Sequence, residues 1–255
     1  MAVVILKNGN PAVWVHDANL GQDGRAGHPA VGNDAVDAVT FDSGGHQNRQ
    51  GLESGVFEWT GLFEGNATTV PPRSYAIAKD LFGDGTGNST ARVTSYYMTD
   101  PSVGAAPGWG FDAARGFGMA ESGGPGELEE LTISMQQDGT VDHIQSMGSA
   151  RVTNTFTSTW LDLGASSTAG GRFYLHIGTN VAVGGNTRWN FTIQHASATN
   201  AATVVATGAT ATYGTGTSLG AILESTGQLR QFVRMVGTRD ATSGTIEYIV
   251  GGNRI

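Results

Sequence analysis

The chain contains no cysteine, only two lysines (Lys7 and Lys79) and only seven prolines among its 255 residues. The absence of cysteine excludes a disulfide framework, thiol catalysis and cysteine-ligated zinc. Apolar runs are also short. The run at residues 2–6 is too short for a signal peptide, and no stretch approaches the roughly 18–20 apolar residues that span a bilayer. We therefore expect that the protein does not associate with a membrane. We expect it to assemble in a cytoplasm.

The few charged residues are unevenly distributed along the chain. Residues 1–150 hold 18 acidic and 7 basic side chains, a net charge of −11, whereas residues 151–255 hold 4 acidic and 7 basic side chains, a net charge of +3. This asymmetry indicates that the two parts face different surroundings. Because an acidic surface repels phosphate, the first part is a poor candidate for gripping DNA, although DNA could slide along it.

Glycine is abundant, with 39 residues, and strong helix formers are scarce. Short runs of valine, threonine and aromatic residues between glycines are typical of an all-β protein with many turns. A chain of this length buries enough surface to need no disulfide or metal for its core. We place a domain boundary near residue 150, with a β-sandwich or barrel domain at 1–150 and a C-terminal β-sandwich domain at 151–255.

Hydrophobic alternation predicts most of the strands in the first part. They are expected at 3–6, 13–15, 36–41, 50–64, 91–99, 115–121, 127–136 and 141–147. In the strand at 50–64, Phe57 and Trp59 point to one side and Glu58 to the other. The one predicted helix covers 74–82. Residues 18–35 are glycine-rich without periodicity, so we expect a long loop or arm there.

The second part is predicted to be a series of short strands. They are expected at 152–163, 172–177, 188–195, 203–213, 229–236 and 245–250. The clearest alternation is at 188–195, where Trp189 and Phe191 face one side and Asn190 and Thr192 the other. Short strands at regular spacing, with Gly, Ser and Asn turns between them, favour a β-sandwich.

One motif invites comparison with a hydrolase. Residues 216–220 match the Gly-x-Ser-x-Gly nucleophile elbow, with Ser218 as the nucleophile. That fold requires a parallel sheet around the motif and a catalytic histidine after the serine. No such βα pattern surrounds Ser218, and the last histidine, His195, precedes it. A turn in a Gly/Thr-rich loop is the simpler interpretation.

Other polar groupings also lack a required part. The loop at Asp84 begins like a calcium site, but Ser95 stands where a late acidic ligand is needed. The acidic run at 127–130 is simpler to interpret as a solvated face than as a pair of catalytic carboxylates. Asp142 and His143 are adjacent, so on a strand they point to opposite faces. We predict no catalytic, cofactor-binding or metal-binding residue, and no cofactor.

The order of segments resembles that of the tail tube proteins of long-tailed bacteriophages. The matching segments are VVILKNGN near the start, DAVTF at 37–41, GLESGVFEWTGLFEG at 51–65 and the helix SYAIAKDLF. In that family a segment with the pattern of Gly51, Leu52, Gly55, Gly61 and Phe63 forms a strand of the tube sheet. The resemblance also implies that the helix packs on the flank of the sandwich. The second part looks like the β-domain appended to some of these proteins, through WLDLG (160–164), RFYLHIG (172–178), FTIQHAS (191–197) and LRQFVRMVG (229–237).

The resemblance implies a structural role in the virion tail and no enzymatic activity. Hexameric rings would stack into a tube, and their sheets would join into one barrel around a lumen. Linear DNA would pass through the lumen during ejection without specific binding. The partners would be further copies of the chain and other tail proteins, such as the tape measure and terminator proteins. We expect Glu58, Thr132 and Ser134 to face the lumen, because they lie opposite the apolar faces of their strands.

Two other classes of function remain open from the residues alone. The first is a binding module, either a capsid decoration protein or a carbohydrate-binding β-sandwich. The second is an enzyme such as a glycosidase or esterase. A carbohydrate-binding face would need several aromatic side chains on one exposed sheet, and core packing is the stronger explanation for those present.

Overall fold

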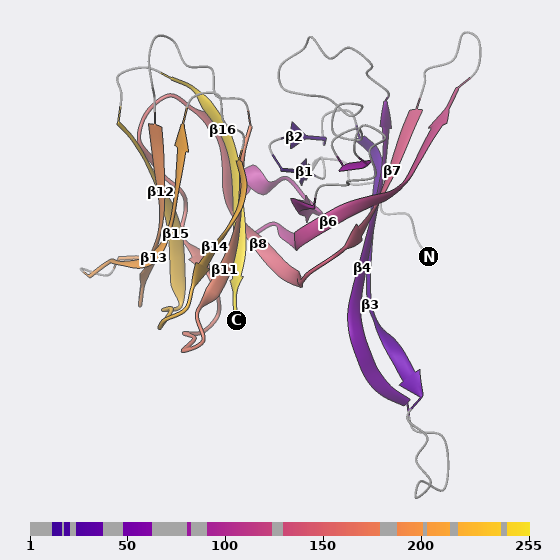
Figure 1. The fold of residues 1–255 in the computed structure, drawn as a ribbon. Helices are drawn as coiled ribbons and strands as arrows, with labels where there is room; N and C mark the ends of the chain where they lie inside the picture. The colour runs from indigo at the N-terminus through magenta and orange to yellow at the C-terminus, as the bar shows by residue number, and fades with distance from the viewer. Residues whose placement is uncertain are drawn as a thin grey trace, which may run out of the picture.

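The computed structural model describes residues 12–16, 18–20, 24–37, 48–62, 81–82, 91–123, 130–178, 188–200, 203–214, 219–240 and 244–255. Within these ranges the chain forms two antiparallel sheets, which confirms the all-β class (Figure 1). A single-turn 3-10 helix covers Pro101–Val103. Of the helix predicted at 74–82, only Leu81 and Phe82 lie among the described residues, and both are helical.

The larger sheet has eleven strands. They are β1 (Ala12–Val15), β2 (Ala18–Asn19), β3 (Gly24–Asp37), β4 (Asn48–Leu62), β5 (Arg92–Tyr97), β6 (Pro107–Ser122), β7 (Glu130–Gln137), β8 (Val141–Val152), β11 (Gly171–Ile177), β14 (Leu219–Ser225) and β16 (Ile246–Arg254). The main path runs β14-β11-β16-β8-β6-β5-β1-β2. A branch continues from β6 through β7 and β4 to β3.

The smaller sheet contains β9 (Phe156–Thr157), β10 (Leu161–Asp162), β12 (Arg188–Ala196), β13 (Val205–Gly214) and β15 (Phe232–Arg239). It packs against the β14-β11-β16-β8 end of the larger sheet. The buried side chains between the two sheets include Trp189 and Phe191 from β12 and Phe173 and Leu175 from β11. This arrangement confirms the alternation predicted for 188–195 and gives the second part its sandwich.

Strand β11 is buried on both of its faces. Phe173 and Leu175 face the sandwich core, whereas Tyr174 and His176 face a second cluster that contains Trp14 and Tyr97 of the first part. A strand covered on both faces reads as a nearly continuous apolar run. The strands β1 and β5 therefore form a third layer over the sandwich.

The first part has a core of its own. Phe57 and Trp59 of β4 pack with Leu131, Ile133 and Met135 of β7, and all five side chains are almost fully buried. The residues between them point away from this core, and Glu58 is exposed. The alternation predicted for these two strands is confirmed.

The prediction of a loop at 18–35 is wrong for most of that range. Residues 24–37 form β3, which pairs with β4 from Gly24↔Gly61 to Asp37↔Asn48. Main-chain hydrogen bonds define such a strand, so a segment rich in Gly and Ala and without alternation can adopt it. Pro29 lies within β3, as is usual for a strand at the edge of a sheet. The far end of the β3–β4 hairpin projects from the body of the molecule, as an arm would (Figure 1).

Two further strand predictions need correction. The strand expected at 152–163 is reduced to the two-residue strands β9 and β10. Strand β14 was missed, although it pairs with β11 over seven residues, from Ile177↔Leu219 to Gly171↔Ser225. Gly220 weakens the strand signal in the sequence. A glycine is nevertheless required at this position, because an added Cβ would lie 2.7 Å from the Cα atom of His16.

Strand β8 connects the two parts of the chain. One of its edges pairs with β6, from Phe111↔Val141 to Pro107↔Gln145. Its other edge pairs with β16, from Gly252↔Gln145 to Ile246↔Val152. The larger sheet therefore runs without a break across residue 150, where we expected a boundary.

Several sequence-based expectations lie outside the described residues. They are the strand at 3–6, residues 38–41, most of the helix at 74–82, and Phe63, Asp84, Glu127, Glu129 and Ser218.

Candidate assembly surface

The branch β3-β4-β7-β6 is a four-stranded antiparallel sheet with two unlike faces. One face covers the core of the first part. On the other face Glu58 of β4 lies directly opposite Ser134 of β7, and Thr60 lies opposite Thr132. The hydroxyl oxygens of Thr60 and Thr132 are 2.9 Å apart. The three residues singled out from the sequence, Glu58, Thr132 and Ser134, thus share the face that points away from the core.

This polar face continues onto β6. Gly118 lies opposite Ser134, Ala120 opposite Thr132, and Ser122 opposite Glu130. Over this stretch the side chains of β7 and β6 are small and mostly uncharged. The longer side chains of Gln136 and Arg115, which lie opposite each other, share the face at one end. The acidic residues on it are Glu58, which is exposed, and Glu130, which is partly buried.

The other acidic residues described in the first part lie elsewhere or already have partners. Asp138 forms an exposed ion pair with Arg115. Asp142 forms an ion pair with Arg172 of the second part. Asp112 accepts a hydrogen bond from the Thr140 N–H. Among the described residues, the acidity of the first part is therefore not concentrated on the polar face.

Both edges of the four-stranded branch are open within the described part of the chain. Strand β3 pairs only with β4. Beyond Arg115, residues 116–122 of β6 pair only with β7, because β5 pairs with β6 no further than Ala114. An unpaired strand edge presents a row of N–H and C=O groups that can accept another strand.

The open edge of β6 also carries exposed apolar side chains. Phe117 is 56% exposed and Met119 is 46% exposed. Phe117 is the extra residue of a β-bulge, since Gly116 pairs with Met135 and Gly118 pairs with Ser134. Sequence analysis did not single out this edge. The only signal was the Gly-Phe-Gly sequence, because glycine inside a strand often marks a bulge.

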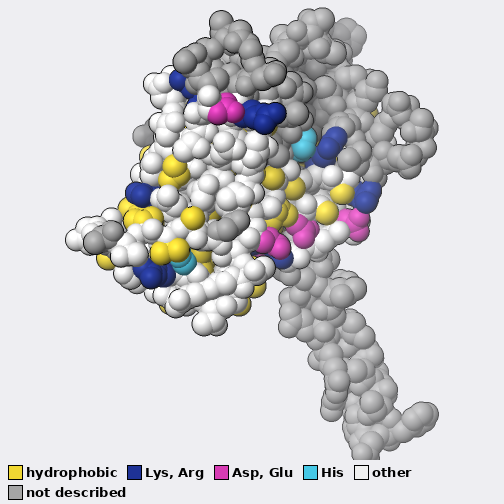
Figure 2. Space-filling view, turned by 60° about the vertical axis from the view of Figure 1, so that its left-hand side comes forward, with side chains coloured by type: hydrophobic (Ala, Val, Ile, Leu, Met, Phe, Trp, Pro, Cys, Tyr) yellow, Lys and Arg dark blue, Asp and Glu magenta, His cyan; other side chains and the backbone are white. Residues whose placement is uncertain are grey.

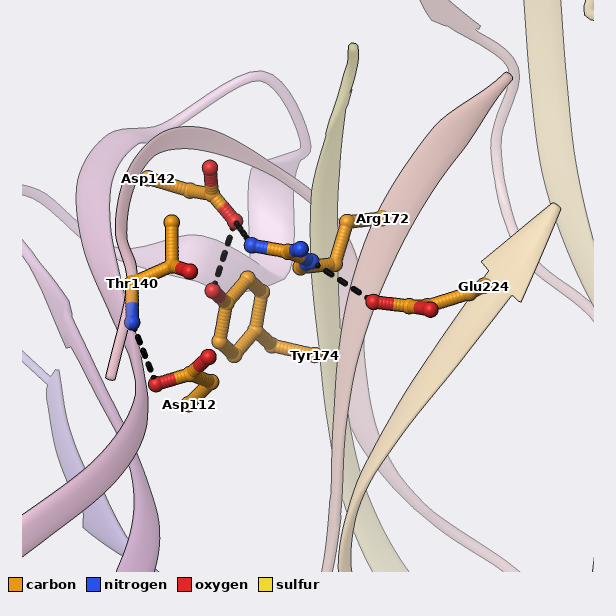
Figure 3. Close-up of polar contacts among 6 residues, drawn as sticks. All are labelled: Asp112, Thr140, Asp142, Arg172, Tyr174 and Glu224. Carbon is orange, nitrogen blue, oxygen red and sulfur yellow. Dashed lines mark hydrogen bonds and ion pairs between the residues drawn. The ribbon is translucent and has the colours of Figure 1, made fainter. Parts of the chain in front are cut away.

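A partly buried polar cluster joins the first part to the second (Figure 3). The Oδ2 atom of Asp142 on β8 accepts hydrogen bonds from the Tyr174 hydroxyl at 2.7 Å and from Arg172 Nη1 at 3.1 Å. Arg172 also donates through Nε to Glu224 on β14 at 3.0 Å. Burial, together with the hydrogen bond to Asp142, raises the pKa of Tyr174. The tyrosine therefore stays a neutral donor to the carboxylate.

The neighbouring His143 takes no part in this cluster. It is exposed and its ring lies 3.6 Å from that of Trp109, centroid to centroid. Asp142 and His143 therefore point to opposite faces, as expected for adjacent strand residues, and do not form a catalytic pair.

A fully buried histidine forms a second contact between the two parts. His176 Nδ1 lies 2.8 Å from the carbonyl oxygen of His16, and its Nε2 lies 2.8 Å from Ser95 Oγ. Burial lowers the pKa of His176 to about 4, so the ring is neutral near pH 7. Because a carbonyl only accepts, Nδ1 carries the proton and Nε2 accepts from the serine hydroxyl. This contact holds structure together and is closed to any substrate.

The described residues contain neither a metal cluster nor a membrane-spanning helix. Within them no group of three or more His, Asp and Glu side chains is placed to hold a metal ion. No helix in these ranges has the length and apolar character to cross a bilayer. Of the five tryptophans, Trp14, Trp59 and Trp189 are fully buried in cores, whereas Trp109 and Trp160 are partly exposed.

Comparison with known proteins gives structural neighbours only. No family model and no curated protein matches the chain. A chain from the tail of a gene transfer agent particle is 15% identical, with a TM-score of 0.35, over 48% of this chain and 81% of that one. A chain of the PVC sheath–tube complex, an extracellular contractile injection system, is 10% identical, with a TM-score of 0.39, over 55% and 94%.

The Dit protein of phage SPP1 covers most of the chain. It is 12% identical, with a TM-score of 0.34, over 96% of this chain and 99% of that one. The structural neighbours are thus phage-tail and tube-like proteins, the class that the sequence resembles. Since all these TM-scores lie below 0.5, the function proposed below rests on the geometry of the chain itself.

Proposed function

We propose that the chain is a structural subunit of a phage tail tube, which assembles into rings through the branch β3-β4-β7-β6. The observation that supports this is a four-stranded sheet with an apolar face on its own core, a polar face and two open edges. Closing such sheets into a barrel removes the edges altogether. The role is structural, with no enzymatic activity and no cofactor.

The directions of the strands suit this closure. Each neighbouring pair in the branch is antiparallel, so β3 and β6 run in opposite directions. Rotation about a ring axis preserves the direction of every strand. The open part of β6 in one subunit would therefore meet β3 of the next in antiparallel orientation and continue the pattern. Pro29 lacks an N–H, so it would interrupt that pairing at one residue.

The β3–β4 hairpin supports a second contact, between stacked rings. Beyond the residues that pair with β7, β4 pairs only with β3, and the far end of the hairpin extends from the body as a two-stranded ribbon (Figure 1). An isolated two-stranded ribbon is at best marginally stable in water. Packing against the neighbouring ring would bury it, so we assign it the role of a stacking arm.

The polar face would line the lumen of the tube. Glu58, Thr132 and Ser134 would then face passing DNA, which a lining with small hydroxyl groups and an exposed carboxylate would not bind. The sequence resemblance implies six subunits per ring, with tape measure and terminator proteins as further partners. Assembly would take place in the host cytoplasm. We retain 1–150 as the tube-forming unit and 151–255 as an outer unit.

Proline substitutions at the β6 edge test the proposal. Met119 and Ala120 are consecutive, so one of them directs its N–H toward β7 and the other toward the open edge. We replace each of the two residues by proline in turn. The proline that removes the N–H at the open edge should leave the melting temperature of the monomer unchanged. The same variant should form no rings or tubes in negative-stain electron microscopy. Ala120→Val keeps the N–H and should still assemble.

Two results would reject the proposal. One is a wild-type chain that stays monomeric at all concentrations and in the presence of other tail proteins. The other is a pair of proline variants that both assemble like the wild type. Binding to capsids without self-assembly would favour the capsid decoration protein instead.

A further inference from the structure

The outer face of the smaller sheet is an exposed surface that the tail-tube proposal does not use. Its inner face packs in the sandwich core, so the alternate residues of β12, β13 and β15 point outward. The register places Asn190 beside Thr212 and Thr238, and Thr192 beside Thr210 and Val236. Gln194 lies beside Arg234.

Most of this face consists of uncharged groups that form hydrogen bonds. Thr157, Thr210, Thr212, Thr238 and Asn190 are exposed, and Thr192 and Gln194 are partly exposed. Figure 2 turns this side of the molecule toward the viewer and shows mainly uncharged polar side chains and backbone, with scattered hydrophobic side chains and isolated arginines. A solvated sheet face more often carries both signs of charge, so this composition suits a hydroxyl-rich partner.

Arg234 lies within this face and forms no ion pair with any residue that the structure describes. The Arg234 guanidinium lies over the ring of Trp160, 4.5 Å from the centroid. Its Nε donates to Gln194 Oε1 at 3.0 Å. No carboxylate among the described residues forms an ion pair with Arg234. The cation–π contact and the hydrogen bond hold the guanidinium in place, so its remaining N–H groups are oriented for an external anion.

The acidic group at the border of the face is already engaged. Asp162 on β10 accepts hydrogen bonds from the Gly164 N–H at 2.7 Å and from Gln231 Nε2 at 2.9 Å, both through Oδ1. At the other end of β12, the carboxylate of Asp240 accepts a hydrogen bond from the main-chain N–H of Arg188 at 2.6 Å. Among the described residues, the positive charge without an ion-pair partner on this face is therefore that of Arg234, in keeping with the net charge of +3 of residues 151–255.

We propose that this face binds an acidic polysaccharide, a sugar chain that carries carboxylate groups. A sugar carboxylate would pair with Arg234, and the threonine and amide side chains would bond to sugar hydroxyls. Trp160 would act by positioning Arg234. Duplex DNA fits less well, because its charge density, about one charge per 1.7 Å, suits a cluster of cations and not an arginine among neutral groups. This inference stands independently of the tail-tube proposal.

Affinity electrophoresis with three probes tests the inference. Alginate supplies carboxylated sugars, dextran supplies neutral sugars, and a DNA duplex supplies phosphate. Alginate should retard the wild-type chain, and dextran and DNA should not. Arg234→Gln should weaken alginate binding at least tenfold, and Trp160→Leu should weaken it less. Binding should also weaken as salt rises, because part of it is electrostatic.

Arg151→Gln is the matched control. Arg151 is an exposed arginine on β8, outside this face, and the substitution changes the net charge equally. It should alter the affinity less than twofold, and near-ultraviolet circular dichroism should show that all three variants are folded.

Four outcomes would overturn the inference. They are an absence of alginate binding, equal retardation by dextran, stronger binding to DNA, and an equal loss of binding in Arg151→Gln. If Arg234→Gln blocked ring assembly and the wild type bound no alginate, the face would belong to a contact between subunits.

Discussion

The Nε2 atom of His176 lies 2.8 Å from the Oγ atom of Ser95, which joins β11 of the second part to β5 of the first. The histidine has a pKa of about 4 in the folded chain, below its ordinary value of 6.5. The unfolded chain therefore takes up this proton first as the pH falls. Stability from the neutral ring is complete above pH 6.5 and is lost progressively between pH 6.5 and pH 4.

Acid should therefore weaken the fold through His176 in a measurable way. We compare the wild type with His176→Gln, which has no titrating group at this position, by urea unfolding at pH 7 and pH 4. Any advantage of the wild type in free energy of unfolding should shrink by about 3 kcal/mol over this range. Carboxylates titrate equally in both proteins. A difference that does not change with pH would contradict the prediction.

Asp142→Asn should destabilise the chain by about 2 kcal/mol. The substitution removes the negative charge of the carboxylate that accepts hydrogen bonds from both Arg172 and Tyr174. The Asp142 side chain is only 14% exposed. Part of the loss is offset because Arg172 keeps its contact with Glu224. Asp138→Asn serves as the control, since its ion pair with Arg115 is about half exposed and should contribute under 1 kcal/mol. Equal effects in chemical denaturation would contradict this account.

Gly110→Ala should also destabilise the contact between the two parts. An added Cβ would lie 2.6 Å from the Tyr174 ring, and this ring is held by Asp142. Overpacking of this kind costs about 1–3 kcal/mol. Gly227→Ala is the control, because nothing lies within 4 Å of its added Cβ. Thermal unfolding should separate the two variants by several degrees.

The exposed edge of β6 yields a prediction about assembly. Replacing Phe117 and Met119 together by serine should change the stability of the monomer by less than about 0.5 kcal/mol, because neither side chain is buried. Light scattering should show that assembly needs a higher concentration. Val103→Ser is the control, since Val103 is 77% exposed on the 3-10 helix and lies outside the β6 edge. Unchanged assembly of the double variant would exclude this edge from the contact.

The sequence was most informative where side chains alternate between core and solvent. The strands containing Trp59, Ile133 and Trp189 follow from this alternation, since each buries one face. The shared face of Glu58, Thr132 and Ser134 follows from it as well. That this face lines a lumen remains a proposal, because alternation distinguishes only two faces and not what each one meets.

Other features depend on pairing that side chains do not encode. Strand β3 is held by main-chain bonds, so its Gly and Ala residues give no periodic signal. The cluster of Asp142, Arg172 and Tyr174 brings together residues about 30 positions apart. In the sheet β16 lies between β8 and β11, so neither sequence distance nor direct strand pairing predicts this contact. The open edge of β6 likewise becomes visible only when the ends of β5 and β7 are known.

The shared strand β8 has a mechanical consequence. A flexible linker would let an outer unit swing when it is pulled. Here β8 joins the two parts directly. It forms main-chain hydrogen bonds to β6 on one edge and to β16 on the other. Moving the sandwich independently of the first part would therefore require main-chain hydrogen bonds of β8 to break. The second part is thus fixed to the first through the sheet itself.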